Sequence, residues 1–300
     1  MSRVRVRVPA TSANLGPGFD VLGLALALYN EVVLEPHGTV SVSIEGEGAE
    51  HLERDERNVV VRGVRAVYER VRRPFPGVKI VCVNRIPTGR GLGSSAAAWL
   101  GGIVGANALL GGPLDGATLL DLAASGEGHP DNAAAALLGG LTVSGWTDGR
   151  VVAVSLPVPP EIHWVVLIPD VEGSTAQARA VLPQTVSRAD AVFNLQRVAL
   201  LLAAFRDRRA DLLAVAMEDR LHQPYRRHLF PWMERVAAAA RSAGAAGCVL
   251  SGAGPSLLAA VIGAADRVAL AMESALGEWG IPGRAAVLAV DSVGTVWEPA

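Results

Sequence analysis

A glycine-rich turn between an apolar run and an Ala-rich run constrains the fold of this chain most strongly. The run 78–83 is rich in β-branched residues and predicts a strand, whereas the segment from about 95 to 110 predicts a helix. Three glycines and a Ser-Ser pair lie between them. Glycines let backbone N–H groups approach an anion closely, and the first turn of a helix favours negative charge. The turn therefore predicts a phosphate-binding loop, although a helix cap with tight glycine packing would leave the same pattern.

The residues of this loop are Pro87, Thr88, Gly89, Arg90, Gly91, Leu92, Gly93, Ser94, Ser95, Ala96 and Ala97. The loop is not of the Walker type, because no Lys precedes the serine pair, and its glycine spacing differs from that of dinucleotide-binding loops. The eleven residues resemble the central motif of the GHMP kinases, which include galactokinase, homoserine kinase, mevalonate kinase and phosphomevalonate kinase. The resemblance implies that this loop binds ATP and that Ser95 is a ligand of Mg²⁺.

Composition places the chain among globular proteins. Of its 300 residues, 50% are apolar and 19% are charged, which leaves ample material for a core. The net charge of −2 gives no reason to expect a nucleic-acid partner. Cys82 and Cys248 lie in separate apolar runs and are expected to be reduced, buried thiols of a cytoplasmic protein. The N-terminal segment alternates Arg and Val, which predicts a strand and neither a signal peptide nor a membrane span.

A polar loop is predicted after that first strand. The segment 9–20 contains Pro, Gly and several polar residues, and it could be an ordinary turn or part of a site. Further strands are predicted at 21–28, 31–34 and 40–44, and Asn58 is expected to cap a helix. The segment 9–20 resembles the N-terminal motif of homoserine kinases. The resemblance implies that Asn14 holds an acceptor hydroxyl and that Asp20 binds an ammonium group.

Four polar residues gather at the start of an Ala-rich helix: Glu127, His129, Asp131 and Asn132. In isolation they could simply cap the helix. The sequence Gly-His-Pro-Asp-Asn resembles a homoserine kinase motif, which implies that His129, Asp131 and Asn132 lie at the acceptor. Mevalonate kinase has an Asp where this chain has Asn132, so no dedicated general base is expected here.

The resemblance leaves the second Mg²⁺ ligand open. The family has a Glu eleven residues before the position of Asn132, and this chain has the shorter Asp121 there. Glu127 is the alternative if Asp121 does not reach the metal. One protein carboxylate would suffice, because Mg²⁺ usually keeps several waters.

A cluster of prolines at 157–160 predicts a boundary between domains 1–156 and 157–300. Beyond it, the expected order is strand, helices, strand, strand, helix, strand, which is the order of a ferredoxin-like unit. The expected elements are a strand at 162–168, helices within 175–243, strands at 248–250 and 257–262, a helix at 264–276 and a strand at 285–290. The fold class is thus predicted as α+β, a two-domain GHMP kinase fold. It pairs an N-terminal α/β domain like domain 2 of ribosomal protein S5 with a C-terminal ferredoxin-like domain.

A second glycine turn, 251–256, joins two strands of that unit and resembles the C-terminal GHMP motif. The resemblance implies that Gly252 and Gly254 lie beside the nucleotide phosphates. It also implies that Arg179 and Arg226 grip the carboxylate of the acceptor, although any one arginine in this Arg-rich chain could lie at the surface.

The resemblance as a whole implies phosphorylation of the L-homoserine side-chain hydroxyl by MgATP, which gives O-phospho-L-homoserine for threonine biosynthesis. A kinase of the same fold for threonine, mevalonate or a sugar is the alternative, as is a binding protein without turnover. A homodimer is the family expectation.

Overall fold

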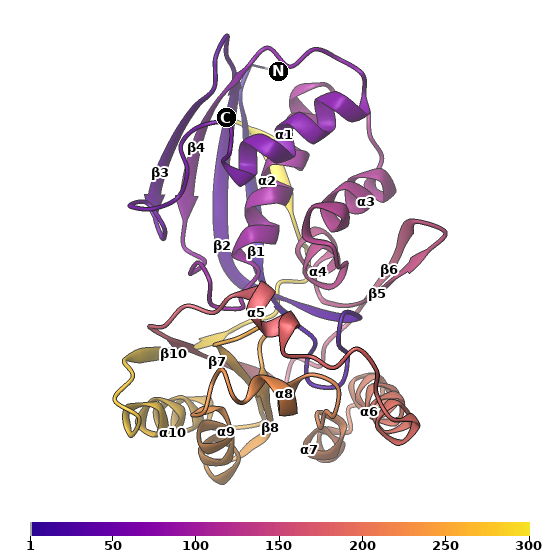
Figure 1. Cartoon of the computed structure of the whole chain (residues 1–300), viewed down its shortest axis with the longest axis vertical. Coiled ribbons are helices and arrows are strands. Elements are labelled where there is room, and N and C mark those ends of the chain that lie inside the picture. The colour runs from indigo at the N-terminus through magenta and orange to yellow at the C-terminus, as the bar shows by residue number, and fades with distance from the viewer. Residues whose placement is uncertain (1) are drawn as a thin grey trace.

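Seven strands form the first sheet, which fills the N-terminal half of the molecule (Figure 1). The structure is a computed structural model and describes residues 2–300. The strand order is β11-β1-β2-β4-β3, and β5 pairs with β2 and with β6. All neighbours are antiparallel except β3 and β4. The strands are β1 (Val4–Ala13), β2 (Leu22–Pro36), β3 (Ser41–Gly46), β4 (Val78–Asn84), β5 (Leu141–Thr147), β6 (Arg150–Leu156) and β11 (Val296–Pro299).

Four helices lie to one side of this sheet (Figure 1). They are α1 (Val59–Arg70), α2 (Ser94–Leu109), α3 (Gly116–Glu127) and α4 (Asp131–Leu138). Helices α2 and α4 contact β1 and β2, while α1 and α3 pack on α2. The approach of α1 to α2 is close because a Cβ on Gly102 would collide with the Val60 carbonyl.

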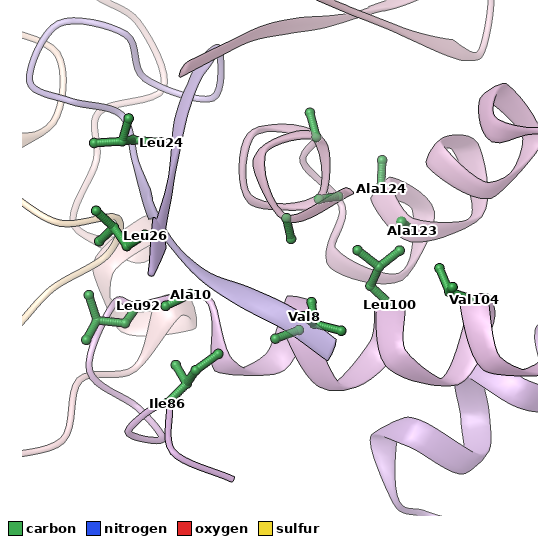
Figure 2. Close-up of a cluster of buried hydrophobic side chains, with 14 of the residues drawn as sticks. Val8, Ala10, Leu24, Leu26, Ile86, Leu92, Leu100, Val104, Ala123 and Ala124 are labelled. Carbon is green, nitrogen blue, oxygen red and sulfur yellow. The ribbon is translucent and has the colours of Figure 1, made fainter. Parts of the chain in front are cut away.

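The core beneath α2 holds the predicted phosphate loop in place. Figure 2 shows Leu100 and Val104 of α2 next to Ala123 of α3. Ile86, directly before the loop, and Leu92, within it, are fully buried in the same cluster. Burying a side chain of this size contributes roughly 1.5–3 kcal/mol, so both the loop and the helix that follows it are firmly anchored.

The second sheet contains four antiparallel strands in the order β10-β7-β9-β8. The strands are β7 (His163–Pro169), β8 (Ala245–Leu250), β9 (Leu257–Val261) and β10 (Gly283–Leu288), and helices α9 (Met233–Ser242) and α10 (Ala265–Gly277) pack against them. When these four strands are numbered 1 to 4 along the chain, their order across the sheet is 4-1-3-2, which is the arrangement of a ferredoxin-like unit. The predicted order of strands and helices is therefore confirmed.

Five further helices, four of them short, elaborate the first crossover of this unit. They are α5 (Thr175–Ala180), α6 (Arg188–Arg206), η1 (Ala210–Leu212), α7 (Leu213–Ala216) and α8 (Gln223–Arg226). Helix α5 lies between the two halves of the molecule (Figure 1), where its side chains can reach both.

Several predicted element boundaries are wrong. Strand β1 continues through Pro9, where the sequence predicted a loop, because a register shift between Pro9 and Ala10 accommodates the missing N–H. The two strands predicted at 21–28 and 31–34 are one strand, β2. The predicted cap is confirmed, since the Asn58 side chain accepts the Val60 N–H at 2.9 Å at the start of α1.

Strand β11 was not predicted. It pairs with β1 in the first sheet, so the end of the chain returns to the N-terminal half. The domain boundary between residues 156 and 157 stays a prediction. Strand β11 belongs to the predicted second domain in sequence but pairs with the sheet of the first.

Within residues 2–300, no helix is both long enough and apolar enough to cross a lipid bilayer.

Candidate functional site

A cleft of about 150 Å³ lies where the two halves of the molecule meet. The first half contributes the loop after β1, the predicted phosphate loop and the start of α4. The second half contributes the start of α5, α8 and the second glycine turn. The lining residues are Ala13, Asn14, Phe19, Asp20, Gly89, Arg90, Gly91, Leu92, Gly93, Ser94, Ser95, Glu127, His129, Asp131, Asn132, Gly173, Thr175, Arg179, Arg226, Gly252, Ala253 and Gly254.

The predicted phosphate loop forms one wall of this cleft through residues 89–95. Gly93 directly precedes α2 with a φ of 69°, in the left-handed region. Within residues 2–300, no side chain caps α2, so its first N–H groups remain available. A Cβ on Gly93 would collide with the Thr11 hydroxyl. Glycine is therefore required both for the left-handed backbone conformation and for the lack of room for a side chain. The loop therefore offers backbone donors and a helix N-terminus to an anion.

The other predicted loop residues do not line this cleft. Pro87, Ala96 and Ala97 are buried and support the loop from behind. Thr88 instead lines an adjoining cavity.

This adjoining cavity has a volume of about 200 Å³ and shares Gly89, Ser94 and Ser95 with the cleft. Its walls are mostly apolar, with the amides of Asn58 and Asn84 among them. This cavity was not predicted from the sequence, because the pattern around Asn58 indicates only a helix cap. An apolar cavity with a few polar groups beside an anion-binding loop suits a planar aromatic base.

Of the two carboxylates predicted as metal ligands, one reaches the cleft and the other does not. The Ser95 hydroxyl donates to Glu127 Oε1 at 2.8 Å, which places the two predicted ligands side by side. Asp121 is directed elsewhere: its carboxylate accepts from Arg150 Nε at 3.1 Å and from the Val151 N–H at 2.7 Å. The prediction of Asp121 as a ligand is therefore corrected, because its oxygens are used to attach α3 to β6. Adjacent hydroxyl and carboxylate oxygens are the donors that Mg²⁺ prefers, so Ser95 and Glu127 fit this ion.

The loop after β1 is strained and closely held. Asn14, Leu15 and Asp20 all have positive φ, of 72°, 47° and 57°. Non-glycine residues adopt this conformation rarely, and such strain concentrates at functional sites. The Asn14 amide is already engaged, since Nδ2 donates to the Gly252 carbonyl at 2.9 Å and Oδ1 accepts the Asp20 N–H at 3.1 Å. Asn14 thus fixes the loop and lines the cleft, and its Nδ2 has a second N–H that neither of these two bonds uses.

The two predicted arginines both face this loop. Arg179 pairs with Asp20 through two hydrogen bonds of 2.7 and 3.0 Å. This hydrogen bond raises the pKa of Arg179 despite partial burial. Arg226 is only 2% exposed, and it donates to the carbonyls of Ala178 at 3.0 Å and Gly252 at 2.9 Å. The two guanidinium groups are thus brought together beside Asp20.

Phe19 and His222 support these arginines and were not singled out from the sequence. The Phe19 ring lies 5.4 Å from the guanidinium carbon of each arginine and stacks on His222 at 5.5 Å. His222 is fully buried, and burial lowers its pKa more than nearby Asp219 raises it. A neutral His222 ring can donate Nε2–H to the Gly16 carbonyl at 2.8 Å and accept from Arg226 at 3.2 Å.

A chain of polar contacts crosses the start of α4. His129 Nδ1 lies 2.7 Å from Asp131 Oδ1, and the Thr11 hydroxyl donates to Asn132 Oδ1 at 2.7 Å. Burial lowers the pKa of His129, but the hydrogen bond and the charge of Asp131 outweigh it, so the pKa is raised overall. Asp131 is 2% exposed and also accepts the Asn132 N–H. These side chains are held rigidly at the cleft.

The second glycine turn closes the cleft from the opposite side. Gly252 and Gly254 both line the cleft and have positive φ, of 54° and 84°. Gly173, Thr175 and Ala253 also line it but carried no sequence signal of their own, because small residues in loops are common. The cleft as a whole combines an anion-binding loop, a candidate metal pair and a paired set of cationic and anionic side chains.

Comparison with family models gives two matches. The model described as the GHMP kinases N terminal domain matches residues 58–140, and that described as GHMP kinases C terminal matches residues 201–278. The first match includes the phosphate loop and Glu127, and the second includes Arg226 and the second glycine turn.

Relatives over nearly the full length carry a more specific name. A homoserine kinase from Moorella thermoacetica is 49% identical over 92% of this chain and 93% of its own length. One from Synechococcus sp. is 46% identical over 98% of this chain and 97% of its own. Among solved structures, homoserine kinase from Cytophaga hutchinsonii superposes with a TM-score of 0.90 at 32% identity, covering 99% of this chain and 98% of that one.

Proposed function

This chain belongs to the homoserine kinases of the GHMP kinase family, and we propose that it transfers the γ-phosphoryl group of ATP to the side-chain hydroxyl of L-homoserine. The product is O-phospho-L-homoserine, an intermediate of threonine biosynthesis. The observation that carries the proposal is the meeting, in one cleft, of the phosphate loop with Asp20, Arg179 and Arg226. The loop suits a triphosphate, and the three charged side chains suit a small amino acid.

ATP is assigned to the loop and to the adjoining cavity. Backbone N–H groups of residues 89–95 and the start of α2 would receive the phosphates, and the apolar cavity beside Ser94 would receive the base. Arg90 lines the cleft and adds a cation to this side. Phosphoryl transfer depends mainly on such positioning and charge neutralisation.

Mg²⁺ is assigned to Ser95 and Glu127, whose oxygens lie 2.8 Å apart. When bound, the ion would neutralise charge on the phosphate oxygens as the phosphoryl group departs.

The acceptor is assigned to the opposite wall of the cleft. Asp20, with Asp131 close by, would bind the ammonium group, and Arg179 with Arg226 would bind the carboxylate, because guanidinium forks match carboxylates in geometry. The free N–H of Asn14 would then donate to the acceptor hydroxyl.

No side chain is assigned as a dedicated general base. Asn132 does not titrate, and its carbonyl oxygen already accepts the Thr11 hydroxyl at 2.7 Å. The His129 imidazole is engaged with Asp131, which favours its protonated form. A positioned hydroxyl facing a neutralised γ-phosphate is the mechanism that these contacts favour.

The test is ADP release by the purified full-length chain with MgATP and a panel of acceptors. Homoserine is expected to give the highest kcat/KM. A higher value for threonine, mevalonate or a sugar would favour a sister kinase of the same fold. ATP binding without ADP release for any acceptor would favour a binding protein without turnover.

Two broader assignments remain proposals. We propose a homodimer, as the family suggests, and sedimentation or light scattering of the purified chain would measure it. We also propose a cytoplasmic location, which suits Cys82 and Cys248, two buried thiols that form no disulfide in residues 2–300.

A further inference from the structure

The acceptor wall of the cleft contains a closed ion pair. Arg179 Nη2 lies 2.7 Å from Asp20 Oδ1, and Arg179 Nη1 lies 3.0 Å from Asp20 Oδ2, which is bidentate geometry. The partners come from different halves of the chain, since Asp20 lies just before β2 and Arg179 belongs to α5. The two side chains assigned to opposite ends of an amino acid are therefore paired with each other.

The guanidinium beside this pair has no carboxylate of its own. Arg226 is 2% exposed, and within residues 2–300 its donors are matched by carbonyls and by His222 rather than by an Asp or a Glu. Burial, and then repulsion from Arg179, lowers the pKa of Arg226 to about 10. A buried cation beside a second cation is costly unless an anion joins it. This side of the pair therefore favours a carboxylate.

The other side of the pair favours a cation. One ligand atom each of Asp20, His129 and Asp131 lie within 4.8 Å of one another. Asp131 is already matched by His129 at 2.7 Å, whereas Asp20 is matched by Arg179. If Arg179 turns toward a substrate carboxylate, Asp20 loses its partner beside a second carboxylate. An ammonium group at that point would restore the balance.

From these contacts, and resting on the proposed function, we infer that the Asp20–Arg179 pair selects zwitterionic acceptors by exchanging partners with them. The substrate ammonium replaces Arg179 at Asp20, and the substrate carboxylate replaces Asp20 at Arg179 and joins Arg226. Every charged group of the pair, of Arg226 and of the substrate then has an oppositely charged partner once the substrate is bound. The exchange costs little for an amino acid because two ion pairs replace one pair and one unmatched guanidinium.

An acceptor with one charge breaks this balance. γ-Hydroxybutyrate, which is homoserine without its ammonium group, would satisfy Arg179 and Arg226 but leave Asp20 unmatched. Sites built around a substrate polar group reject analogues that lack it by roughly 10⁴–10⁵-fold. Because the Arg179 and Asp20 side chains are 38% and 32% exposed, solvent reduces that penalty, and a rejection of about 10²–10³-fold is expected.

The decisive experiment is Asp20→Asn in the full-length chain. The Asn side chain has nearly the shape of Asp but carries no charge, so it no longer forms an ion pair with Arg179. It also leaves no unpaired carboxylate when an acceptor without an ammonium group binds. Binding of γ-hydroxybutyrate, measured by calorimetry with ADP and Mg²⁺ present, is expected to tighten at least tenfold relative to the wild type. The kcat/KM for homoserine is expected to fall by about 10²-fold, since the ammonium loses a charge-assisted contact of roughly 1.5–3 kcal/mol.

Arg179→Gln is the matched control, because it opens the same pair from the other side. It should weaken binding of both homoserine and γ-hydroxybutyrate, since the carboxylate loses a guanidinium in each case. Thermal unfolding and the Kd for ADP verify that both variants fold. If Asp20→Asn leaves γ-hydroxybutyrate binding unchanged or weaker, or if neither protein binds it detectably, the exchange is refuted. The proposed function fails separately, if the wild-type chain does not phosphorylate homoserine.

Discussion

Replacing Glu127 and Asp121 in turn tests which carboxylate serves the metal. Glu127 Oε1 lies 2.8 Å from the Ser95 hydroxyl at the cleft, whereas both oxygens of Asp121 are bonded to residues at the start of β6. Glu127→Gln keeps an oxygen that can accept the Ser95 hydroxyl but removes the negative charge. The fold should therefore be preserved while the affinity for Mg²⁺ falls.

The expected magnitudes differ widely between the two positions. A metal ion contributes several kcal/mol to stabilising charge in the transition state. Losing about 3–4 kcal/mol of it lowers kcat by roughly 10²–10³-fold, at 1.36 kcal/mol per tenfold. Asp121→Asn removes an ion pair with Arg150, whose side chain is 61% exposed, and such pairs are worth about 0.2–1 kcal/mol of stability. The Asn carbonyl can still accept the Val151 N–H, so activity should be unchanged.

The assay is the initial rate of ADP release with homoserine, measured against MgCl₂ concentration at fixed ATP. Glu127→Gln is expected to raise the Mg²⁺ concentration for half-maximal rate at least tenfold and to lower the plateau. Asp121→Asn is expected to follow the wild-type curve, with a slightly lower Tm. The assignment is refuted if Asp121→Asn shows the larger loss, or if Glu127→Gln retains the wild-type dependence on Mg²⁺.

Three further substitutions probe the loop and the start of α4. Gly93→Ala requires an alanine to adopt a left-handed φ, which costs about 1–2 kcal/mol, and it places a methyl group against the Thr11 hydroxyl. The KM for ATP should therefore rise at least tenfold. An unchanged KM would contradict the proposed role of the loop in binding ATP. His129→Gln should lower Tm more at about pH 6 than at about pH 9. The pKa of His129 is raised in the folded protein, so the imidazole contributes stability below its unfolded pKa of about 6.5, and this contribution is lost as the pH rises through the folded pKa. A loss of Tm that does not depend on pH would argue against the His129–Asp131 ion pair. Asn132→Ala should lower kcat only about tenfold, and a loss near the upper end of the 10²–10⁴-fold range typical of general acid–base catalysis would show that a base has been overlooked.

Local sequence patterns predicted the parts of this fold that local chemistry determines. The phosphate loop was predicted from the strand–glycine–helix order, and its glycines do have the left-handed backbone that made them informative. The family and the fold class were predicted from the motifs and are confirmed. Strand β11 was missed because its four residues are stabilised by pairing with β1, almost three hundred positions earlier in the chain.

The site was predicted residue by residue, but its pairing was not. Motif resemblance named Asp20 and Arg179 as acceptor ligands, yet no local signal shows that they bond to each other across 159 positions. Phe19 and His222 were missed for the same reason, since an aromatic ring and a buried histidine gain their role only from what they contact. Spacing alone also kept Asp121 as a candidate, whereas the contacts of α3 with β6 turn its carboxylate away.

The second glycine turn, residues 251–256, forms hydrogen bonds both to the phosphate loop and to the side of the cleft that is assigned to the acceptor. The Ser251 hydroxyl lies 2.7 Å from the Gly91 carbonyl of the phosphate loop. One residue later, the Gly252 carbonyl accepts from both Asn14 and Arg226 on the acceptor side. A shift of this turn would therefore move groups that are proposed to bind ATP as well as groups that are proposed to bind the acceptor. We therefore expect binding at the two walls to be coupled. Because such coupling is equal in both directions, ATP should change the Kd for homoserine by the same factor as homoserine changes the Kd for ATP.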